Sequence, residues 1–276
     1  MEFARPTQLD DALAMLATGE WDVLAGGTDY FPALQDEHPI APILDISAIE
    51  GLRGVSPSVD GWRIGALTTW TDLIRADLPP VFDALKLSAR EVGSIQIQNR
   101  ATVAGNLCNA SPAADGVPPL LIMDANVELS SSAGQRVLPL TDFVLSNRQT
   151  ALSEGELLTA ILIPERAARG RSSFLKLGTR KYLVISIAMV SVRLVLEDDR
   201  VSDAAVAVGA CSVVAQRLSD LENELIGSAI PKLSNVVTAR HFAGLTPISD
   251  IRASDSYREV AAIELVKRAI AQAARR

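Results

Sequence analysis

The sequence predicts an α+β protein whose β-rich C-terminal part ends in a long helix. Apolar residues recur at helical spacing in some segments and form short β-branched runs in others. Clusters of Gly, Pro and Asp separate these segments, and some neighbouring strands are joined by short turns. The chain has 276 residues, 48% hydrophobic and 21% charged, which is enough to bury a substantial core. Helices that follow strands, together with hairpins, indicate an α+β fold.

Helix and strand alternate in the first half of the chain. Thr7 is expected to cap a first helix that Gly19 ends, and Thr69 with Asp72 has the spacing of a capping box for another. The stretch 92–115 is rich in small and polar residues and is expected to be loop-rich. The predicted strands are 21–25, 43–46, 62–66, 126–130, 135–140 and 157–163, and the further predicted helices are 79–90 and 120–124.

The second half begins after a polar stretch, 165–172, which is the expected domain boundary. Two β-rich runs, 185–196 and 201–208, follow and meet at an Asp-Asp turn. A helix over 218–225 ends at Gly227. The final helix is expected to open with a capping box of Ser256 and Glu259. Its predicted apolar stripe consists of Val260, Ile263, Val266 and Ile270.

Composition and charge exclude several classes of function. A net charge of −7 and a pI of about 5.0 argue against nucleic acid as a partner, because phosphate binding needs clustered Lys and Arg. No apolar run approaches the roughly 20 residues that cross a bilayer. The first residues also lack the regions of a signal peptide. We therefore expect a cytoplasmic protein without membrane insertion.

Residues that bind metals are scarce. The chain has two cysteines, Cys108 and Cys211, and two histidines, His38 and His241. Neither pair has the spacing of a zinc or iron–sulfur ligand set. We expect both cysteines to stay reduced and Cys108 to be a small buried thiol. No metal site and no catalytic acid, base or nucleophile is predicted.

Two segments are candidate ligand-binding sites. The first is the run Leu24-Ala25-Gly26-Gly27-Thr28-Asp29, which follows a predicted strand. Glycine lets the backbone approach a ligand and turn its N–H groups toward an anion such as a pyrophosphate. An isolated Gly-Gly pair is more often a plain tight turn, and the run lacks the GxGxxG pattern of a Rossmann fold.

The second candidate segment, 100–115, combines many small residues with few charges. Thr102, Asn106 and Ser111 supply neutral hydrogen-bonding groups. Asp115 can accept bonds from hydroxyls such as those of a ribose or ribityl chain. The alternative is a polar surface loop, but the number of small residues favours a ligand site.

Together these segments resemble the FAD-binding subunit of the molybdenum hydroxylases, the family of xanthine dehydrogenase and carbon monoxide dehydrogenase. The runs AGGTD and RATVAGNLCNASPAAD are similar to the two flavin-binding loops of that family, in the same order and at a similar spacing. Segments 174–182, 206–217 and 250–258 are similar to later family segments. The resemblance therefore spans nearly the whole chain.

The resemblance implies two domains. Residues 1–165 are expected to form an FAD-binding domain of the PCMH or vanillyl-alcohol-oxidase-like type, with subdomains of about 1–55 and 56–165. Residues 171–276 are expected to form a smaller α+β domain of the carbon monoxide dehydrogenase flavoprotein type, with a three-stranded antiparallel sheet and helices.

The resemblance also assigns positions around a non-covalent FAD. At one of them, Ala104 replaces the first glycine of the family's Gly-Gly pair. A methyl group is tolerated there at negative φ and is awkward at positive φ. Tyr182 is expected either to stack near the flavin or to be an ordinary core or interface tyrosine. The positions carried over for FAD are Leu24, Ala25, Gly26, Gly27, Thr28, Asp29, Thr102, Val103, Ala104, Gly105, Asn106, Ser111, Asp115, Leu158 and Lys176.

The function implied is electron transfer inside a multi-subunit oxidoreductase. In the resembling family, a large subunit holds the molybdenum cofactor and a small subunit holds [2Fe–2S] clusters. The FAD subunit passes electrons to NAD+, O2 or a quinone. A heterotrimer or a dimer of heterotrimers is the expected assembly. Two alternatives stay open, a self-sufficient FAD-dependent oxidoreductase and a flavin-free scaffold of the same fold, which only Ala104 supports.

Overall fold

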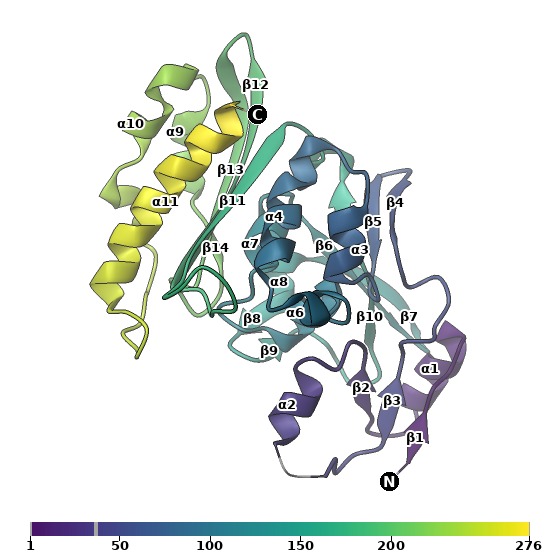
Figure 1. The fold of residues 1–276 in the computed structure, drawn as a ribbon. Helices are drawn as coiled ribbons and strands as arrows, with labels where there is room; N and C mark the ends of the chain where they lie inside the picture. Colours follow the sequence, from purple (N-terminus) through teal and green to yellow (C-terminus); the bar gives the residue numbers. More distant parts are fainter. Residues whose placement is uncertain (1, 36–37, 276) are drawn as a thin grey trace.

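Three parallel strands near the N-terminus form the first sheet, in the order β1-β3-β2. The computed structural model describes residues 2–35 and 38–275. Leu13 and Leu16 of helix α1 pack with Leu44 and Ile46 in one apolar cluster. Figure 1 shows this unit in purple at one end of the molecule. Its elements are β1 (Phe3–Ala4), α1 (Leu9–Leu16), β2 (Asp22–Leu24), α2 (Tyr30–Leu34) and β3 (Ile43–Asp45).

An antiparallel sheet with strand order β4-β5-β10-β6-β7 forms the centre of the molecule. The predicted hairpin β6–β7 is confirmed, and the predicted strand β10 lies between β5 and β6. Helices contribute Trp70, Phe82 and Leu107 to the apolar core of this sheet. Its elements are β4 (Val55–Ser58), β5 (Gly61–Gly65), α3 (Trp70–Arg75), η1 (Pro80–Phe82), α4 (Asp83–Glu91), α5 (Ile95–Gln98), α6 (Val103–Asn109), α7 (Val117–Leu121), β6 (Asn126–Ser131), β7 (Gly134–Pro139), α8 (Leu140–Phe143), β8 (Val144–Ser146), β9 (Gln149–Thr150), β10 (Leu157–Pro164) and η2 (Glu165–Ala167).

The C-terminal sheet, in the order β11-β12-β13-β14, is antiparallel and buried on both faces. It contains the three expected strands and a two-residue edge strand, β14, that the sequence did not predict. Side chains of β13 alternate between the faces. Ala205 and Ala207 join the core of the central sheet, whereas Val206 and Val208 join the cluster under α9 and α11. The elements are β11 (Arg171–Leu177), β12 (Ala188–Glu197), β13 (Arg200–Gly209), β14 (Gln216–Arg217), α9 (Ser219–Leu225), η3 (Ile230–Lys232), α10 (Leu233–Val236), η4 (Ala239–Phe242) and α11 (Asp255–Arg275).

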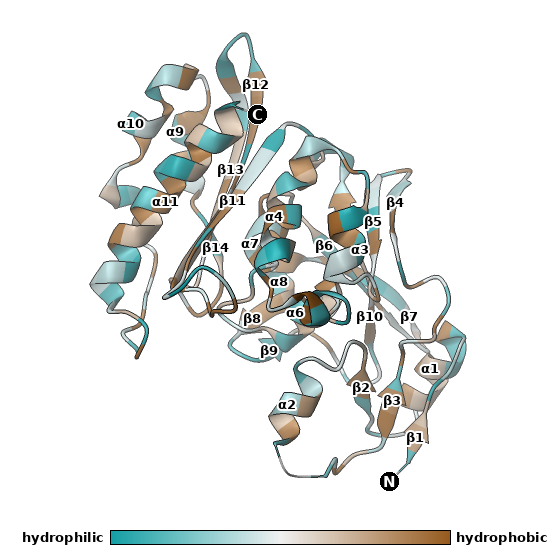
Figure 2. Cartoon of the chain, viewed as in Figure 1, coloured by the Kyte–Doolittle hydropathy of each residue, from teal (hydrophilic) through white to brown (hydrophobic). Residues whose placement is uncertain are grey.

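Helix α11 lies across the C-terminal sheet and is hydrophilic on its outer side, as Figure 2 shows. The predicted stripe is confirmed for Val266 and Ile270, which are fully buried, but Val260 is 66% exposed. Alanines make up most of the buried face, and so the helix approaches the sheet closely. Within residues 2–35 and 38–275, no helix has the length and apolar character needed to cross a membrane.

The predicted capping box of α11 is wrong. The helix begins at Asp255, one residue before Ser256, so Ser256 lies inside the first turn and Glu259 lies beyond it. The hydroxyl of Ser254 accepts a hydrogen bond from the N–H of Tyr257 at 3.2 Å and takes the capping role.

Two further local predictions are wrong. Helix α1 is capped by Gln8 and not by Thr7, and no side-chain hydrogen bond closes its first turn. The stretch 92–115 is less irregular than its composition indicates, because it contains the helices α5 and α6. Both helices are too short to show apolar periodicity over a window of 11 or more residues. Side-chain caps from Ser94 and Thr102 define their first turns.

A buried serine joins the C-terminal sheet to the helices of the central sheet. Ser172 of β11 accepts a hydrogen bond from the N–H of Ala84 at 2.8 Å and donates one to the carbonyl of Val81 at 2.7 Å. The Ser172 side chain is fully buried. Water therefore cannot replace either bond, and the contact fixes the packing of α4 against β11.

Replacing Ser172 by Ala should lower the free energy of unfolding by about 1–3 kcal/mol, because a buried N–H loses its acceptor. Urea denaturation of the full chain measures this change. Ser202 is a matched control, since its exposed hydroxyl makes one 3.3 Å bond to the carbonyl of Val195. Ser202→Ala should change the free energy by no more than about 0.5 kcal/mol. Equal losses for the two variants would contradict the structural role of Ser172.

Candidate functional site

A cavity of about 780 Å³ lies where the N-terminal sheet, the helices of the central sheet and the C-terminal domain meet. Its walls are the loop after β2, the segment from α5 to residue 115, and the connection between β11 and β12. The volume falls within the range of about 300–1,000 Å³ that is typical of ligand sites. The predicted residues that line this cavity are Leu24, Ala25, Gly26, Gly27, Thr28, Asp29, Thr102, Gly105, Asn106, Ser111, Asp115 and Lys176.

The two glycines of the first loop are required by close contacts. A Cβ atom on Gly26 would lie 2.2 Å from the carbonyl oxygen of Arg100. Gly27 has a φ of +74°, and a Cβ atom there would lie 2.9 Å from the ring of Phe31. The first loop therefore rests directly on the backbone of the second, and the two candidate segments form one site.

Helix α6 positions the second segment. The hydroxyl of Thr102 accepts a hydrogen bond from the N–H of Gly105 at 2.9 Å and caps the helix. The N–H of Val103 donates to the carbonyl of Thr68 at 3.0 Å, which attaches the helix to the start of α3. These bonds turn the Gly105 side of α6 toward the cavity. The residues of α6 that line the cavity are Gly105, Asn106, Cys108 and Asn109.

Three predicted positions, Val103, Ala104 and Leu158, are not among the residues that line the cavity, and their assignment to FAD stays a prediction. Val103 and Ala104 lie on the opposite face of α6, and Leu158 lies in β10 between two strands. All three side chains are at most 3% exposed, because the core of the central sheet covers them. Ala104 has helical backbone, so its methyl group causes no strain. The substitution thus gives the scaffold alternative no structural support.

The most polar contact in the cavity wall is a buried ion pair between two domains. Lys176 of β11 donates from Nζ to Asp115 Oδ2 at 2.6 Å, and their side chains are only 6% and 8% exposed. Ser186 donates its hydroxyl to the other carboxylate oxygen, Oδ1, also at 2.6 Å. Burial raises the pKa of Asp115, while the charge and hydrogen bond of Lys176 and the hydrogen bond of Ser186 oppose that rise.

Cys108 differs from its expected surroundings, and Tyr182 lies outside the core. Cys108 faces the cavity and is exposed there, so the prediction of a buried thiol is wrong. Tyr182 is 59% exposed, with Lys181 Nζ 5.1 Å from the centre of its ring. It is thus not a core residue, and the adjoining residues 183–185 line the cavity.

Sequence reasoning missed a polar network at the rim. Arg148, in the turn between β8 and β9, donates from its guanidinium to Asn109 Oδ1. Asn109 in turn donates from Nδ2 to Asp29 Oδ1 at 2.9 Å. Asn109 lies inside the second candidate segment, but no sequence signal connected Arg148 with it. The network joins the β8–β9 turn, the end of α6 and the loop after β2 at the rim of the cavity.

The residues present fit an FAD molecule. Gly26, Gly27 and Gly105 line the cavity, and glycine backbone allows the close approach of a pyrophosphate. Ser111 and the remaining lone pairs of Asp115 can bind hydroxyl groups. In the part of the chain that the structure describes, no group of three or more His, Cys, Asp or Glu residues is placed to hold a metal ion.

Comparison with known proteins identifies both halves of the chain. Residues 1–166 match the family described as the FAD binding domain in molybdopterin dehydrogenase. Residues 173–273 match the CO dehydrogenase flavoprotein C-terminal domain. The chain is 30% identical to the nicotine 6-hydroxylase medium subunit of Paenarthrobacter nicotinovorans, over 100% of this chain and 98% of that protein.

Two carbon monoxide dehydrogenases show the same similarity. The medium chain of the enzyme from Hydrogenophaga pseudoflava is 28% identical, over 98% of this chain and 95% of its own length. The structure of reconstituted CO dehydrogenase from Oligotropha carboxidovorans contains a chain that superposes with a TM-score of 0.88 at 26% identity. That superposition covers 100% of this chain and 98% of the other. The α+β prediction and the resemblance are thus confirmed.

Replacing Gly26 by Ala should weaken FAD binding by about tenfold or more, because the new methyl group forces the two loops apart. Titration of the apo chain with FAD, followed by flavin fluorescence, measures the change. Gly19→Ala is the matched control, since its Cβ atom would meet nothing closer than Trp21 Nε1 at 3.7 Å. Unchanged affinity in Gly26→Ala would show that the contact between the loops does not shape the site.

Asp115 should make the apo chain less stable as the pH rises above its ordinary pKa of 3.8. Because its pKa is raised in the folded state, the folded chain binds the proton more tightly than the unfolded chain. Asp115→Asn removes this group, so the stability of the variant relative to wild type should increase with pH from 3.8 up to the raised pKa.

Urea denaturation between acidic and neutral pH tests this slope. The charge of Lys176 opposes the rise in the pKa of Asp115. Lys176→Met removes that charge, so the pH range over which the relative stability changes should extend to higher pH in that variant. A relative stability of Asp115→Asn that decreases with pH would reverse the sign and contradict the assigned cause.

Proposed function

Since the chain belongs to the family of FAD-binding subunits of molybdopterin dehydrogenases, we propose that it relays electrons from the [2Fe–2S] clusters of a partner subunit to an external acceptor. The observation that carries this proposal is the single cavity in which both glycine-containing segments and the Asp115–Lys176 pair meet. Bound FAD supplies a centre that can accept electrons singly and release them in pairs.

The residues of this chain bind and orient the cofactor. In our proposal the backbone at Gly26–Thr28 and at Gly105 receives the pyrophosphate, and Ser111 and Asp115 bind hydroxyl groups. Lys176 would place its charge at the flavin end of the cavity, held by Asp115 at 2.6 Å. In our proposal the free thiol of Cys108, which lines the cavity, takes no part as a nucleophile. No histidine lies among the residues that line the cavity. This supports a relay without its own acid–base chemistry.

The same reasoning extends to the assembly. We propose a large subunit with the molybdenum cofactor and a small [2Fe–2S] subunit as partners, in a heterotrimer or a dimer of heterotrimers. NAD+, O2 or a quinone is the proposed acceptor. We propose residues 1–165 as the FAD-binding domain and 171–276 as the C-terminal domain. Cys108 and Cys211 are free thiols, which agrees with the cytoplasmic location that we propose.

The full chain, purified alone, should carry flavin absorption bands and release one FAD per chain after acid precipitation, because the cofactor is held non-covalently. After chemical reduction of the flavin, reoxidation by NAD+, O2 or a quinone would identify the acceptor. Joint production with candidate large and small subunits should give a stable complex that contains molybdenum and iron.

Two outcomes would contradict the proposal. A folded, colourless chain that takes up no added FAD would overturn the cofactor assignment. Turnover of an organic substrate by the isolated chain would favour the self-sufficient oxidoreductase instead.

A further inference from the structure

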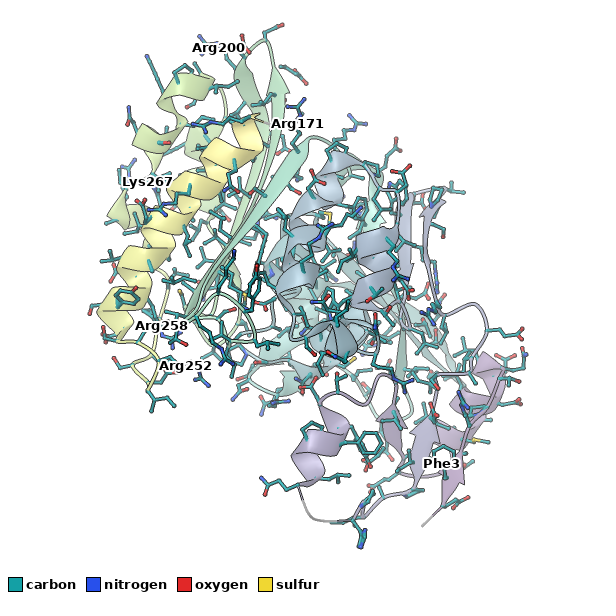
Figure 3. All side chains as sticks on the ribbon, viewed as in Figure 1. Phe3, Arg171, Arg200, Arg252, Arg258 and Lys267 are labelled. Carbon is teal, nitrogen blue, oxygen red and sulfur yellow. The ribbon has the colours of Figure 1, made fainter. Side chains whose placement is uncertain are left out.

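The C-terminal segment 250–258, which the sequence singles out, surrounds a buried arginine at the start of α11. Figure 3 shows Arg252 and Arg258 at this end of the helix, close to the C-terminal sheet. Arg258 is 3% exposed although it is charged. A buried charge persists only where partners compensate its loss of water, so the contacts of Arg258 indicate its role.

The guanidinium of Arg258 joins the ends of two strands. Its Nη1 donates to the carbonyl of Ile187, just before β12, at 2.6 Å and to the carbonyl of Ala210, just after β13, at 3.0 Å. Its Nη2 donates to Asp250 Oδ1 at 2.8 Å. The planar guanidinium makes these diverging bonds at once, which the single ammonium of a lysine cannot reproduce.

Asp250 holds the guanidinium in place. Its carboxylate accepts hydrogen bonds from the N–H groups of Arg252 at 2.8 Å and Ala253 at 3.2 Å, and from Arg252 Nη1 at 2.8 Å. These bonds, the backbone bond from Arg252 first, lower the pKa of Asp250. The carboxylate is therefore ionised at neutral pH and orients Arg258.

Both carbonyls that Arg258 holds are one step from the cofactor cavity. Ile187 follows Ser186, whose hydroxyl donates to Asp115 at 2.6 Å. The N–H of Ala210 donates to the carbonyl of Pro112 at 3.1 Å, inside the second candidate segment. Arg258 itself does not line the cavity. Any effect on the site must pass through these two backbone positions.

We propose that Arg258 is a positioning residue of the FAD site. By holding the Ile187 and Ala210 carbonyls, it fixes Ser186 and the segment around Pro112, and through them the Asp115–Lys176 pair. This inference rests on the proposed assignment of the cavity to FAD. The final helix, far from the glycine loops in sequence, thereby sets the geometry of the wall opposite them.

The test compares Arg258→Lys with a matched control. Arg193 is also buried, at 2% exposed, and donates from Nε to the carbonyl of Ile122 at 2.7 Å and from Nη1 to Asp203 at 2.6 Å. It lies in the same sheet but does not line the cavity. The full-length variants are compared by thermal unfolding, by FAD titration, by the visible circular dichroism of bound flavin, and by hydrogen exchange at the amide of Ala210.

For Arg258→Lys we expect FAD binding weaker by about tenfold or more, the effect of losing at least one charged hydrogen bond. The flavin dichroism should change and exchange at Ala210 should accelerate. Arg193→Lys should lower the melting temperature while FAD affinity stays within about twofold. Asp250→Asn keeps the Arg258 side chain. It should change FAD affinity, flavin dichroism and exchange at Ala210 in the same direction as Arg258→Lys, but by less. If Arg258→Lys does not fold, Asp250→Asn is the deciding variant.

Two results would overturn the inference. One is unchanged FAD affinity and dichroism in Arg258→Lys, or in Asp250→Asn where that variant decides. The other is an equal loss of affinity in Arg193→Lys at an equal loss of stability. If the wild-type chain itself takes up no FAD, the proposed function fails. This result is distinct from a failure of the inference about Arg258, because it is seen before any variant is compared.

Discussion

The buried pair of Asp115 and Lys176 is the contact on which the arrangement of the site depends. It joins a loop of the first domain to a strand of the second, and Ser186 holds the carboxylate from a third segment. Removing both charges from water is costly, and the raised pKa of Asp115 shows that the pairing does not fully repay this cost for the carboxylate. The fold tolerates the cost because the surrounding sheet packing holds the domains together. The cavity is thus bordered by an ion pair that is largely shielded from water.

That sheet packing is itself a constraint on residue size. The C-terminal sheet has helices on one face and the core of the first domain on the other. Alanines at 205 and 207 let the sheet approach the first domain, and alanines of α11 let the helix approach the sheet from the other side. Close approach on both faces leaves little room for adjustment in a core packed to normal density. The strand ends that carry Ser186 and Ala210 therefore occupy defined positions.

The cavity wall made by the first domain depends on missing side chains. A Cβ atom on Gly26 would lie 2.2 Å from the carbonyl oxygen of Arg100, and one on Gly105 would lie 2.8 Å from Thr102 Oγ1. At Ala104 the direction in which the side chain points decides its effect on the site. Its methyl group points into the core on the opposite side of α6, where burial is favourable and nothing approaches from the cavity. Alanine is thus harmless at position 104, where the family has glycine. At Gly26 an alanine is expected to be disruptive, because its Cβ atom would meet the backbone of Arg100.

The sequence by itself determined the α+β class, the order of most strands and helices, and the family resemblance, because these depend on local apolar periodicity, turn residues and contiguous motifs. Most of the positions that it assigned to FAD line the cavity. It placed Cys108 in the core, because a motif does not state which side of a short helix faces inward. Only the tertiary structure decided that Arg148 reaches Asn109, that Lys176 pairs with Asp115, and that Arg258 donates to the carbonyl of Ile187. The physical reason is that these contacts join residues far apart in the chain, and their geometry follows from the packing of whole sheets and helices.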